Sequence, residues 1–145
     1  MLLKTERQIT EQGLNKISSG LLPEGTVLIS SRAPIGYIAV AEVPLAINQG
    51  FIAMKCNGLL DTQFVLQWTL ANGSTFQEIS KKAFRPIKVV YPDNGLLDEF
   101  EKIVGTLHKR CVDLVKQNNR LTEMRDNLSP KLISGELRVE DVNGV

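Results

Sequence analysis

The chain has 145 residues, enough for one domain or for a small domain with an appended element, and it can bury a core without disulfides or a structural metal. Its 43% hydrophobic and 23% charged residues are ordinary for a globular protein, and the net charge of +1 points to neither a nucleic acid nor a membrane surface. The sequence contains no apolar run long enough to span a bilayer and does not begin with the apolar segment of a signal peptide. We therefore expect a cytoplasmic protein with no membrane partner.

Charge is unevenly distributed along the chain. Residues 1–92 carry nine Lys or Arg and six acidic residues, whereas residues 93–145 carry eight and ten. A mildly basic first part permits contact with phosphates. The two cysteines, Cys56 and Cys111, are far apart and have no second metal ligand nearby, so we interpret them as buried thiols in a reducing compartment. No disulfide, metal or cofactor is expected.

Residues 1–92 are predicted to form a small mixed α/β domain. Residues 8–16 favour a short helical turn or a loop. β-branched and apolar runs bounded by Gly, Pro and Asn predict three short strands in a compact antiparallel or mixed sheet. These strands are expected at residues 26–31, 37–43 and 51–55.

The apolar period changes after the third strand. It predicts a helix over residues 61–71, with Asp61 as its N-cap and an ending at Asn72-Gly73. Residues 87–91 predict one more strand, closed by Pro92.

A long helix is predicted from Leu96 to Leu128. Its length of about 50 Å, at roughly 1.5 Å per residue, exceeds what so small a domain can cover, so the helix needs a partner. We expect Pro130 to break or kink it and Ser134-Gly135 to stop it. Three acidic residues crowd its first turn, where the helix dipole favours negative charge. They are Asp98, Glu99 and Glu101.

Apolar residues along this helix alternate in spacings of three and four, which is typical of a coiled coil. With Leu97 at position a, Leu or Phe occupies all five d positions. Asn118 and Arg125 fall at position a, where a buried Asn often fixes register, although a seam that opens toward solvent explains both equally well. The predicted dimer seam comprises Leu97, Phe100, Val104, Leu107, Cys111, Leu114, Asn118, Leu121 and Leu128.

The sequence offers little for catalysis. His108 is the only histidine, and it falls beside the predicted seam, so no Ser/His/Asp or Cys/His set can be built without it. We find no glycine-rich phosphate loop, HExxH pair or cysteine cluster. No catalytic residue and no metal site are predicted, and the chain is expected not to be an enzyme.

Two polar clusters follow apolar strands. Ser30, Ser31 and Arg32 stand at the end of the first strand, and the segment from Asn48 through Gln49 to Gly50 lies between the second strand and the third. Plain turn chemistry explains such residues, because Ser and Asn satisfy local backbone groups. DNA contact is the alternative, because Arg reads guanine and Asn or Gln reads adenine in bidentate geometry.

The densest basic patch contains Lys81, Lys82, Arg85 and Lys88 without an intervening acid. A run of charges is often only a solvated face. Phosphate contact competes evenly with that interpretation here.

Four stretches, in order, resemble the specificity subunits of Type I restriction-modification systems. Residues 25–36 (GTVLISSRAPIG) with 48–51 (NQGF) resemble part of a target recognition domain, and residues 73–87 (GSTFQEISKKAFRPI) follow in the same order. The long helix ending in residues 128–137 (LSPKLISGEL) is similar to the family's helical spacer.

The resemblance implies an α+β architecture: a small mixed α/β target-recognition domain followed by a long coiled-coil-forming helix. The expected boundaries are 1–92 for a partial recognition domain, 93–135 for the spacer helix and its C-terminal turn, and 136–145 for a tail. The implied DNA-contacting residues are Ser31, Arg32, Asn48, Gln49, Lys81, Lys82 and Arg85.

In this family the subunit reads double-stranded DNA, its spacers pair antiparallel, and they dock methyltransferase subunits that hold the catalytic chemistry. Two recognition domains and two spacers are usual, and this chain offers at most one of each. We therefore expect either a fragment or a half-sized subunit that works as a homodimer. The alternative is a coiled-coil assembly module whose truncated domain no longer reads DNA.

Overall fold

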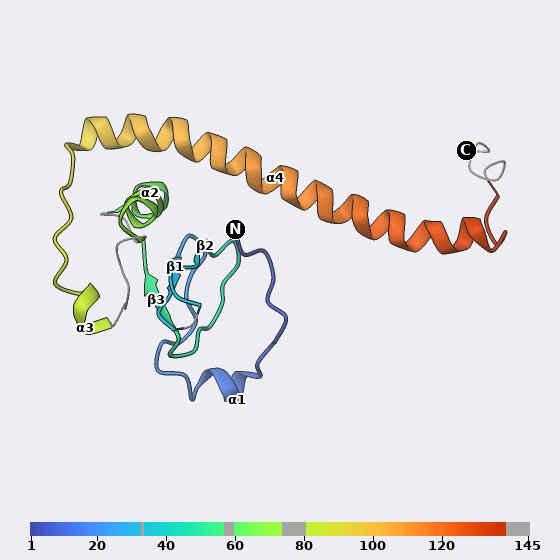
Figure 1. Ribbon diagram of the computed structural model, residues 1–145, viewed down its shortest axis with the longest axis horizontal. Coiled ribbons are helices and arrows are strands. Elements are labelled where there is room, and N and C mark those ends of the chain that lie inside the picture. The colour runs from blue at the N-terminus through green and yellow to red at the C-terminus, as the bar shows by residue number, and fades with distance from the viewer. Residues whose placement is uncertain (33, 57–59, 74–80, 139–145) are drawn as a thin grey trace. The chain divides into compact units, whose positions relative to one another are not determined.

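The computed structural model describes residues 1–32, 34–56, 60–73 and 81–138 (Figure 1). The chain divides into two compact units, Met1–Gly105 and Thr106–Val145. The expected α+β class is confirmed, because a small sheet and several helices precede a long C-terminal helix. No helix in the described part of the chain is long and apolar enough to cross a membrane.

The first unit is built around an antiparallel sheet of three strands in the order β2-β1-β3. The strands are β1 (Val27–Ser30), β2 (Ile38–Val40) and β3 (Phe51–Met54). All three were predicted, with slightly wider bounds. Both neighbours run antiparallel to β1, so the chain enters β2 and β3 at the end of the sheet where β1 stops.

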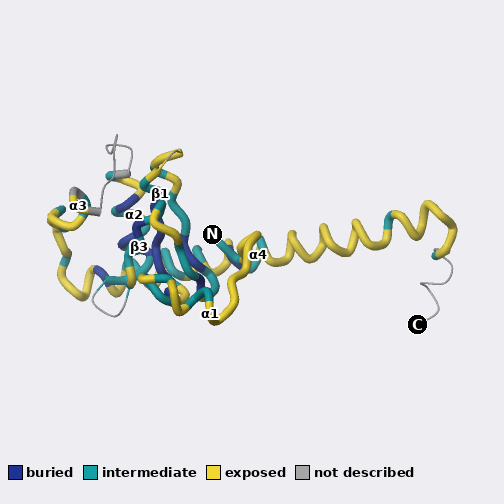
Figure 2. The backbone as a smooth tube through the Cα atoms, turned by 90° about the horizontal axis from the view of Figure 1, so that it is seen from below, coloured by how far each residue is buried: buried dark blue, intermediate teal, exposed yellow. Residues whose placement is uncertain are grey.

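Each face of the sheet carries its own apolar cluster, because successive side chains of a strand point to opposite faces. On one face Leu28 packs with Leu22, Ala41 and Leu45. On the other face Ile29 packs with Ile52, and the neighbouring valines belong to a cluster that continues onto α2. Every residue of β1 is buried, so this strand has no solvent-facing side (Figure 2).

Helix α2 (Thr62–Gly73) covers the second of these faces. Its Val65 packs with Val27 and Val40, and in Figure 1 the helix lies beside the sheet. The predicted start is observed, and the helix continues two residues beyond the predicted end, through Asn72 to Gly73. The backbone N–H of Val65 donates to the carbonyl of Asp61 at 3.0 Å, and the helix ends at Gly73.

The glycine turn that precedes β1 packs against the first residue of α2. Gly25 has a φ of +82°, and a Cβ added there would lie 2.9 Å from Thr62 Oγ1. The same hydroxyl donates a hydrogen bond of 2.9 Å to the Gly25 carbonyl. Glycine is therefore required here both for its backbone conformation and for the close approach of the helix.

Two short helices complete the first unit. Helix α1 (Glu11–Leu14) is the predicted helical turn, capped where the Gly13 N–H donates to Thr10 Oγ1 at 3.2 Å. Helix α3 (Lys81–Phe84) was not predicted. It is attached to the sheet through Phe84, which packs against the cluster containing Ile29.

The strand predicted at residues 87–91 is wrong. The chain passes from α3 to the last helix there without joining the sheet. Alternating apolar residues form a strand only where a neighbouring edge accepts their backbone hydrogen bonds, and Val90 is 90% exposed.

The final helix, α4 (Asn94–Ile133), is longer than predicted at both ends. It begins after Asp93, whose Oδ1 accepts from the N–H of Leu96 at 3.0 Å. Asp98, Glu99 and Glu101 consequently lie beyond the first turn. Pro130 does not end the helix, which continues to Ile133, but the predicted stop is observed at Gly135, where φ is +74°.

Candidate nucleic-acid interface

Three side chains form a row across the sheet at the end of β1. Ser30 is paired with Phe51 of β3, and the Ser30 N–H donates to the Tyr37 carbonyl at 2.9 Å just before β2. Residues directly opposite in an antiparallel sheet share a face. The small Ser30 therefore lies between two aromatic residues, and a depression of about 330 Å³ opens there.

Ser30 also closes the loop that leads to β2. Its hydroxyl donates to the Pro34 carbonyl at 2.7 Å and accepts from the Tyr37 N–H at 2.9 Å. The Gly36 N–H donates to the Ser30 carbonyl at 3.0 Å, with a φ of +87° at Gly36. Turn chemistry accounts for Ser30, as the local interpretation of this cluster predicts.

Arg32, Asn48 and Gln49 all line this depression, and all three are exposed. They come from two different turns, which meet where the Ser31 N–H donates to the Gly50 carbonyl at 2.8 Å. The residues that sequence reasoning nominated on separate strands are thus brought together. Ser31 contributes this backbone bond, and its side chain is not among the lining groups.

Asn48 and Gln49 are held differently. The Gly50 N–H donates to Asn48 Oδ1 at 2.8 Å, which fixes the turn that precedes β3. The Oδ1 atom of Asn48 therefore accepts a hydrogen bond within the turn, whereas Gln49 projects from the same turn as an exposed amide.

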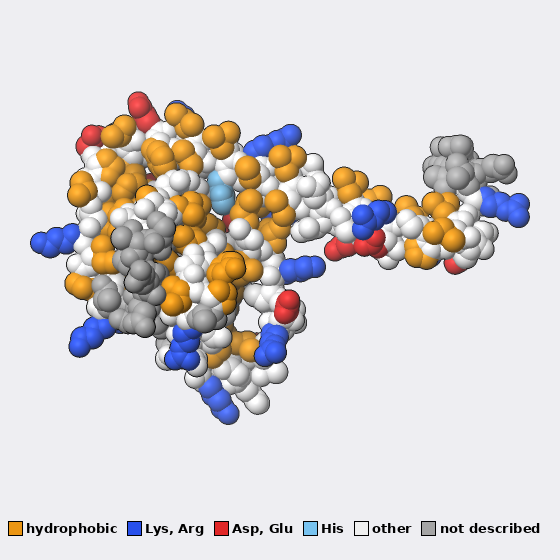
Figure 3. Space-filling model, in the orientation of Figure 1, with side chains coloured by type: hydrophobic (Ala, Val, Ile, Leu, Met, Phe, Trp, Pro, Cys, Tyr) orange, Lys and Arg blue, Asp and Glu red, His pale blue; other side chains and the backbone are white. Residues whose placement is uncertain are grey.

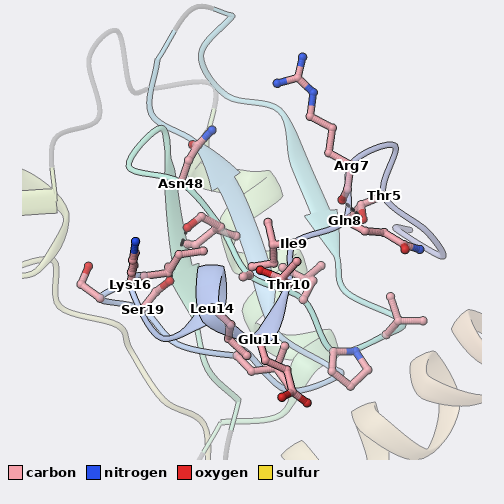
Figure 4. Close-up of a pocket in the computed structure, with 18 of the residues that line it drawn as sticks. Thr5, Arg7, Gln8, Ile9, Thr10, Glu11, Leu14, Lys16, Ser19 and Asn48 are labelled. Carbon is pink, nitrogen blue, oxygen red and sulfur yellow. Dashed lines mark hydrogen bonds between the residues drawn. The ribbon is translucent and has the colours of Figure 1, made fainter.

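A larger and more open depression of about 1050 Å³ adjoins this turn (Figure 4). It lies between the N-terminal segment with α1 and residues 43–49, and Asn48 and Gln49 line both depressions. In Figure 4 the side chain of Arg7 extends away from the cavity. The charged residues that line it are mostly basic, namely Lys4, Arg7 and Lys16, with Glu11 as the acidic one.

The basic patch lies at the same end of the sheet but outside the smaller depression. Lys82, Arg85 and Lys88 are exposed, and the side chain of Lys81 lies outside the described residues. Phe84 packs on the face of the sheet that carries Ile29, opposite the face that carries Ser30 and the aromatic row. In Figure 3 several Lys and Arg side chains gather along the lower part of the first unit, where α1 and α3 lie.

The second unit leaves much of the predicted seam exposed. The leucines have exposed fractions of 44% to 61%: Leu107, Leu114, Leu121 and Leu128. Asn118 is also exposed, and so is Cys111, for which the expectation of a buried thiol was wrong. Sequence reasoning missed Met124, Leu132 and Ile133, which are exposed as well. In the first unit, Leu97 is buried, while Phe100 and Val104 are half-buried.

Arg125, a polar residue of the predicted heptad, forms an ion pair with the next residue of the helix. Its guanidinium contacts Asp126 Oδ1 at 2.7 Å, and both side chains are more than half exposed. A pair this exposed stabilises the helix very little.

The chain matches a known sequence family over most of its length. The sequence model of the Type I restriction modification DNA specificity domain matches residues 3–122. The chain belongs to this family. The predicted resemblance to Type I specificity subunits is thereby confirmed.

Two curated relatives of this specificity-domain family agree with the assignment. The Type I restriction enzyme MjaIX specificity subunit of Methanocaldococcus jannaschii is 29% identical over 138 residues, which cover 88% of this chain and 31% of that protein. The Type I restriction enzyme HindI specificity subunit of Haemophilus influenzae is 22% identical over 148 residues, covering 94% and 32%. The chain therefore spans about a third of the length of these relatives.

Tyr37 and Phe51 are the lining residues that sequence reasoning missed. A repeated pattern was available to find them, because both strands beside β1 begin within a Gly-aromatic-Ile-Ala motif. The copies are residues 36–39 (GYIA) and 50–53 (GFIA). Since both strands run antiparallel to β1, the motif places both aromatic residues at one end of the sheet.

The described residues contain no group of three or more His, Cys, Asp or Glu side chains that could hold a metal ion. His108 is half-buried on α4. Burial raises the pKa of the Cys56 thiol, with smaller opposing effects from its hydrogen bonds to Thr62 and Val27. A thiol with a raised pKa is a poor nucleophile near neutral pH.

Proposed function

We propose that this chain reads double-stranded DNA as the non-catalytic specificity component, or part of one, of a Type I restriction-modification assembly. The observation that carries the proposal is the meeting of Arg32, Asn48 and Gln49 at one depression. Its described lining contains no acidic residue. Family membership supplies the context, because the relatives are named specificity subunits of restriction enzymes.

The side chains divide by the chemistry they offer. The guanidinium of Arg32 matches the O6 and N7 acceptors of guanine, and the amide of Gln49 matches the N6 and N7 groups of adenine. Lys82 and Arg85 lie outside the depression, and exposed cations there suit phosphates. Arg32 therefore contributes to sequence discrimination, whereas Lys82 contributes to affinity for any duplex.

Fluorescence anisotropy across a salt series tests this division in the assembly with methyltransferase subunits. Loss of a bidentate contact in Arg32→Ala is expected to cost about 1–3 kcal/mol at one base pair. Lys82→Ala should weaken cognate and random duplexes alike and reduce the slope of log K against log salt by about one. Lys55→Ala, an exposed cation at the other end of β3, is the matched control and should change neither quantity.

Two results would contradict this assignment. Equal losses on cognate and random duplexes for Arg32→Ala would reduce Arg32 to a phosphate contact or a structural residue. An assembly that forms normally but binds cognate and random duplexes equally would favour the alternative function, an assembly module that no longer reads DNA.

We also propose that the chain self-associates through α4. The exposed row of leucines in the second unit supports this, because a continuous apolar stripe on a soluble helix needs cover. Leu97 is already buried, so the association is assigned to residues from Leu107 onward.

The seam favours an antiparallel pair. In a parallel pair in register, Arg125 would face Arg125, and like charges in a seam repel. In the antiparallel pair each a residue faces a d residue, so Arg125 faces a leucine instead. When the twofold axis of the pair passes between residues 119 and 120, the seam has four kinds of layer, each repeated by symmetry. They are Leu107–Leu132, Cys111–Leu128, Leu114–Arg125 and Asn118–Leu121.

Docking of methyltransferase subunits on α4 and a cytoplasmic location complete the proposal. The chemistry of methyl transfer and cleavage is assigned to those partner chains. The isolated chain should therefore neither methylate nor cleave DNA with S-adenosylmethionine, ATP and magnesium present. Turnover that co-purifies with the chain and disappears on mutation of one of its residues would contradict this.

A further inference from the structure

Tyr37 is the most exposed large hydrophobic side chain at the candidate interface. Its exposed fraction is 67%, although it lies beside a strand whose residues are all buried. Hydrogen bonds with Ser30 hold its backbone on both the N–H and the carbonyl side. The ring is thus an apolar surface presented to solvent from a fixed backbone, next to Arg32 and Gln49.

We propose that Tyr37 is a specificity-determining residue that places its ring against the 5-methyl group of a thymine. The thymine belongs to the base pair next to the one that Arg32 contacts. This inference rests on the proposed DNA-reading function and adds to it a residue and a base chemistry that neither the family match nor the named relatives assign.

The surroundings of the ring favour a base edge over a phosphate. The depression beside Tyr37 is bounded by a second aromatic residue, Phe51, and contains base-reading amide and guanidinium groups. In the major groove thymine presents one carbonyl acceptor and one methyl group, and apolar side chains recognise that methyl. A donor such as Arg32 beside an apolar ring therefore matches a guanine followed by a thymine.

The Tyr37 ring also has no space to be buried in the core. The same face of the sheet beneath it is filled by the cluster around Leu28, which is 4% exposed. Tyr37 must contribute its apolar surface either to solvent or to a partner, and large exposed aromatic residues in polar surroundings are characteristic of contact sites.

Selection from a randomised duplex library tests the inference, using the chain assembled with methyltransferase subunits. The wild-type assembly should select a site with an invariant thymine next to a guanine, and replacing that thymine by uracil should weaken binding about four-fold, the contribution of one buried methyl group. Tyr37→Ala should lose both the thymine preference and the uracil penalty. Tyr37→Phe should keep both, because the ring and not the hydroxyl makes the contact.

Ile35→Ala is the matched control, since Ile35 is exposed in the same loop but does not line the depression. It should select the wild-type site. If Tyr37→Ala selects the same site with the same uracil penalty, the inference is overturned and the DNA-reading function stands. If Tyr37→Phe behaves like Tyr37→Ala, the hydroxyl makes the contact and the methyl assignment is overturned. A wild-type assembly that selects no sequence overturns both.

Discussion

The two units of this chain handle apolar surface in opposite ways. In the first unit both faces of β1 are covered, and Val27 and Ile29 are completely buried. In the second unit exposed leucines recur along α4, and Leu107 and Leu121 are each 61% exposed. The first unit carries a core of its own, whereas the second unit exposes the apolar surface that the proposed self-association would bury.

The polar side chains of the two units also differ in whether they form hydrogen bonds within their own unit or are exposed. At the end of β1 the serine and asparagine side chains close turns within the unit, as in the bond from the Gly50 N–H to Asn48. Along the second unit the polar seam residue Asn118 is exposed, as is the seam cysteine, Cys111. Local hydrogen bonds therefore account for these polar groups of the first unit, whereas the exposed seam residues of the second unit are the ones assigned to the proposed self-association.

The largest effect is expected in the core of the first unit. Ile29→Ala should lower the free energy of unfolding by about 2–5 kcal/mol, because it leaves a cavity between β1, β3 and Phe84. Val90→Ala, at a side chain that is 90% exposed, should change it by less than about 0.5 kcal/mol. Chemical denaturation measures both values. Similar losses for the two variants would show that this cluster is not the core.

The next effect concerns the second unit alone. Leu107→Lys combined with Leu114→Lys should convert the chain from a dimer to a monomer, halving the mass measured by analytical ultracentrifugation, because two lysines cannot be buried in an apolar seam. The denaturation profile of the first unit should stay unchanged. Asn119→Lys with Asn127→Lys adds the same charge at exposed positions off the seam and should leave the dimer intact. An unchanged sedimentation coefficient in the leucine variant would refute self-association through this stripe.

The orientation of the pair can be determined with the native Cys111. In a Cys56→Ser background the antiparallel register places Cys111 opposite residue 128, so Leu128→Cys should form two disulfides across the dimer under mild oxidation. Leu121→Cys should not cross-link to Cys111 and serves as the control. Efficient cross-linking of Cys111 alone, without the added cysteine, would indicate a parallel pair.

A smaller effect is expected at the turn before β1. Gly25→Ala should cost about 1–3 kcal/mol, because it combines a positive φ with a clash against Thr62. Gly20→Ala shares the positive φ, at +62°, but has open space around it. It should therefore cost less, and the difference between the two melting temperatures isolates the contact with α2. Equal shifts would mean that the clash is relieved without cost.

The sequence allowed the strands, α2 and the long helix to be predicted because each carries a local signal. Glycine and proline bounded the three strands, and Asp61 marked the start of α2. Arg32, Asn48 and Gln49 were nominated by residue type at strand ends, and the antiparallel pairing of β1 with β3 brings them together. The ordered motifs added the family, which periodicity alone could not.

Other features depend on information that a local pattern does not contain. The alternation of residues 87–91 matches a strand, but no pattern shows whether a partner edge is present. Asp93 was taken as part of a closing turn after Pro92, although it caps α4. Tyr37 was missed because its exposure follows from the packing beneath it. The stripe on α4 was underestimated because Pro130 was expected to break or kink the helix before Leu132, and because Met124 falls at position g of the heptad.

The loop closure at Ser30 has a consequence for how such a protein changes over evolutionary time. The bonds that shape the turns use Ser30, Asn48 and backbone groups, while Arg32 and Gln49 only project from the result. Substitution at these two projecting positions therefore leaves strand register and turn geometry as they are. Under the proposed DNA-reading function, a change of target would then need one or two codons and no unstable intermediate.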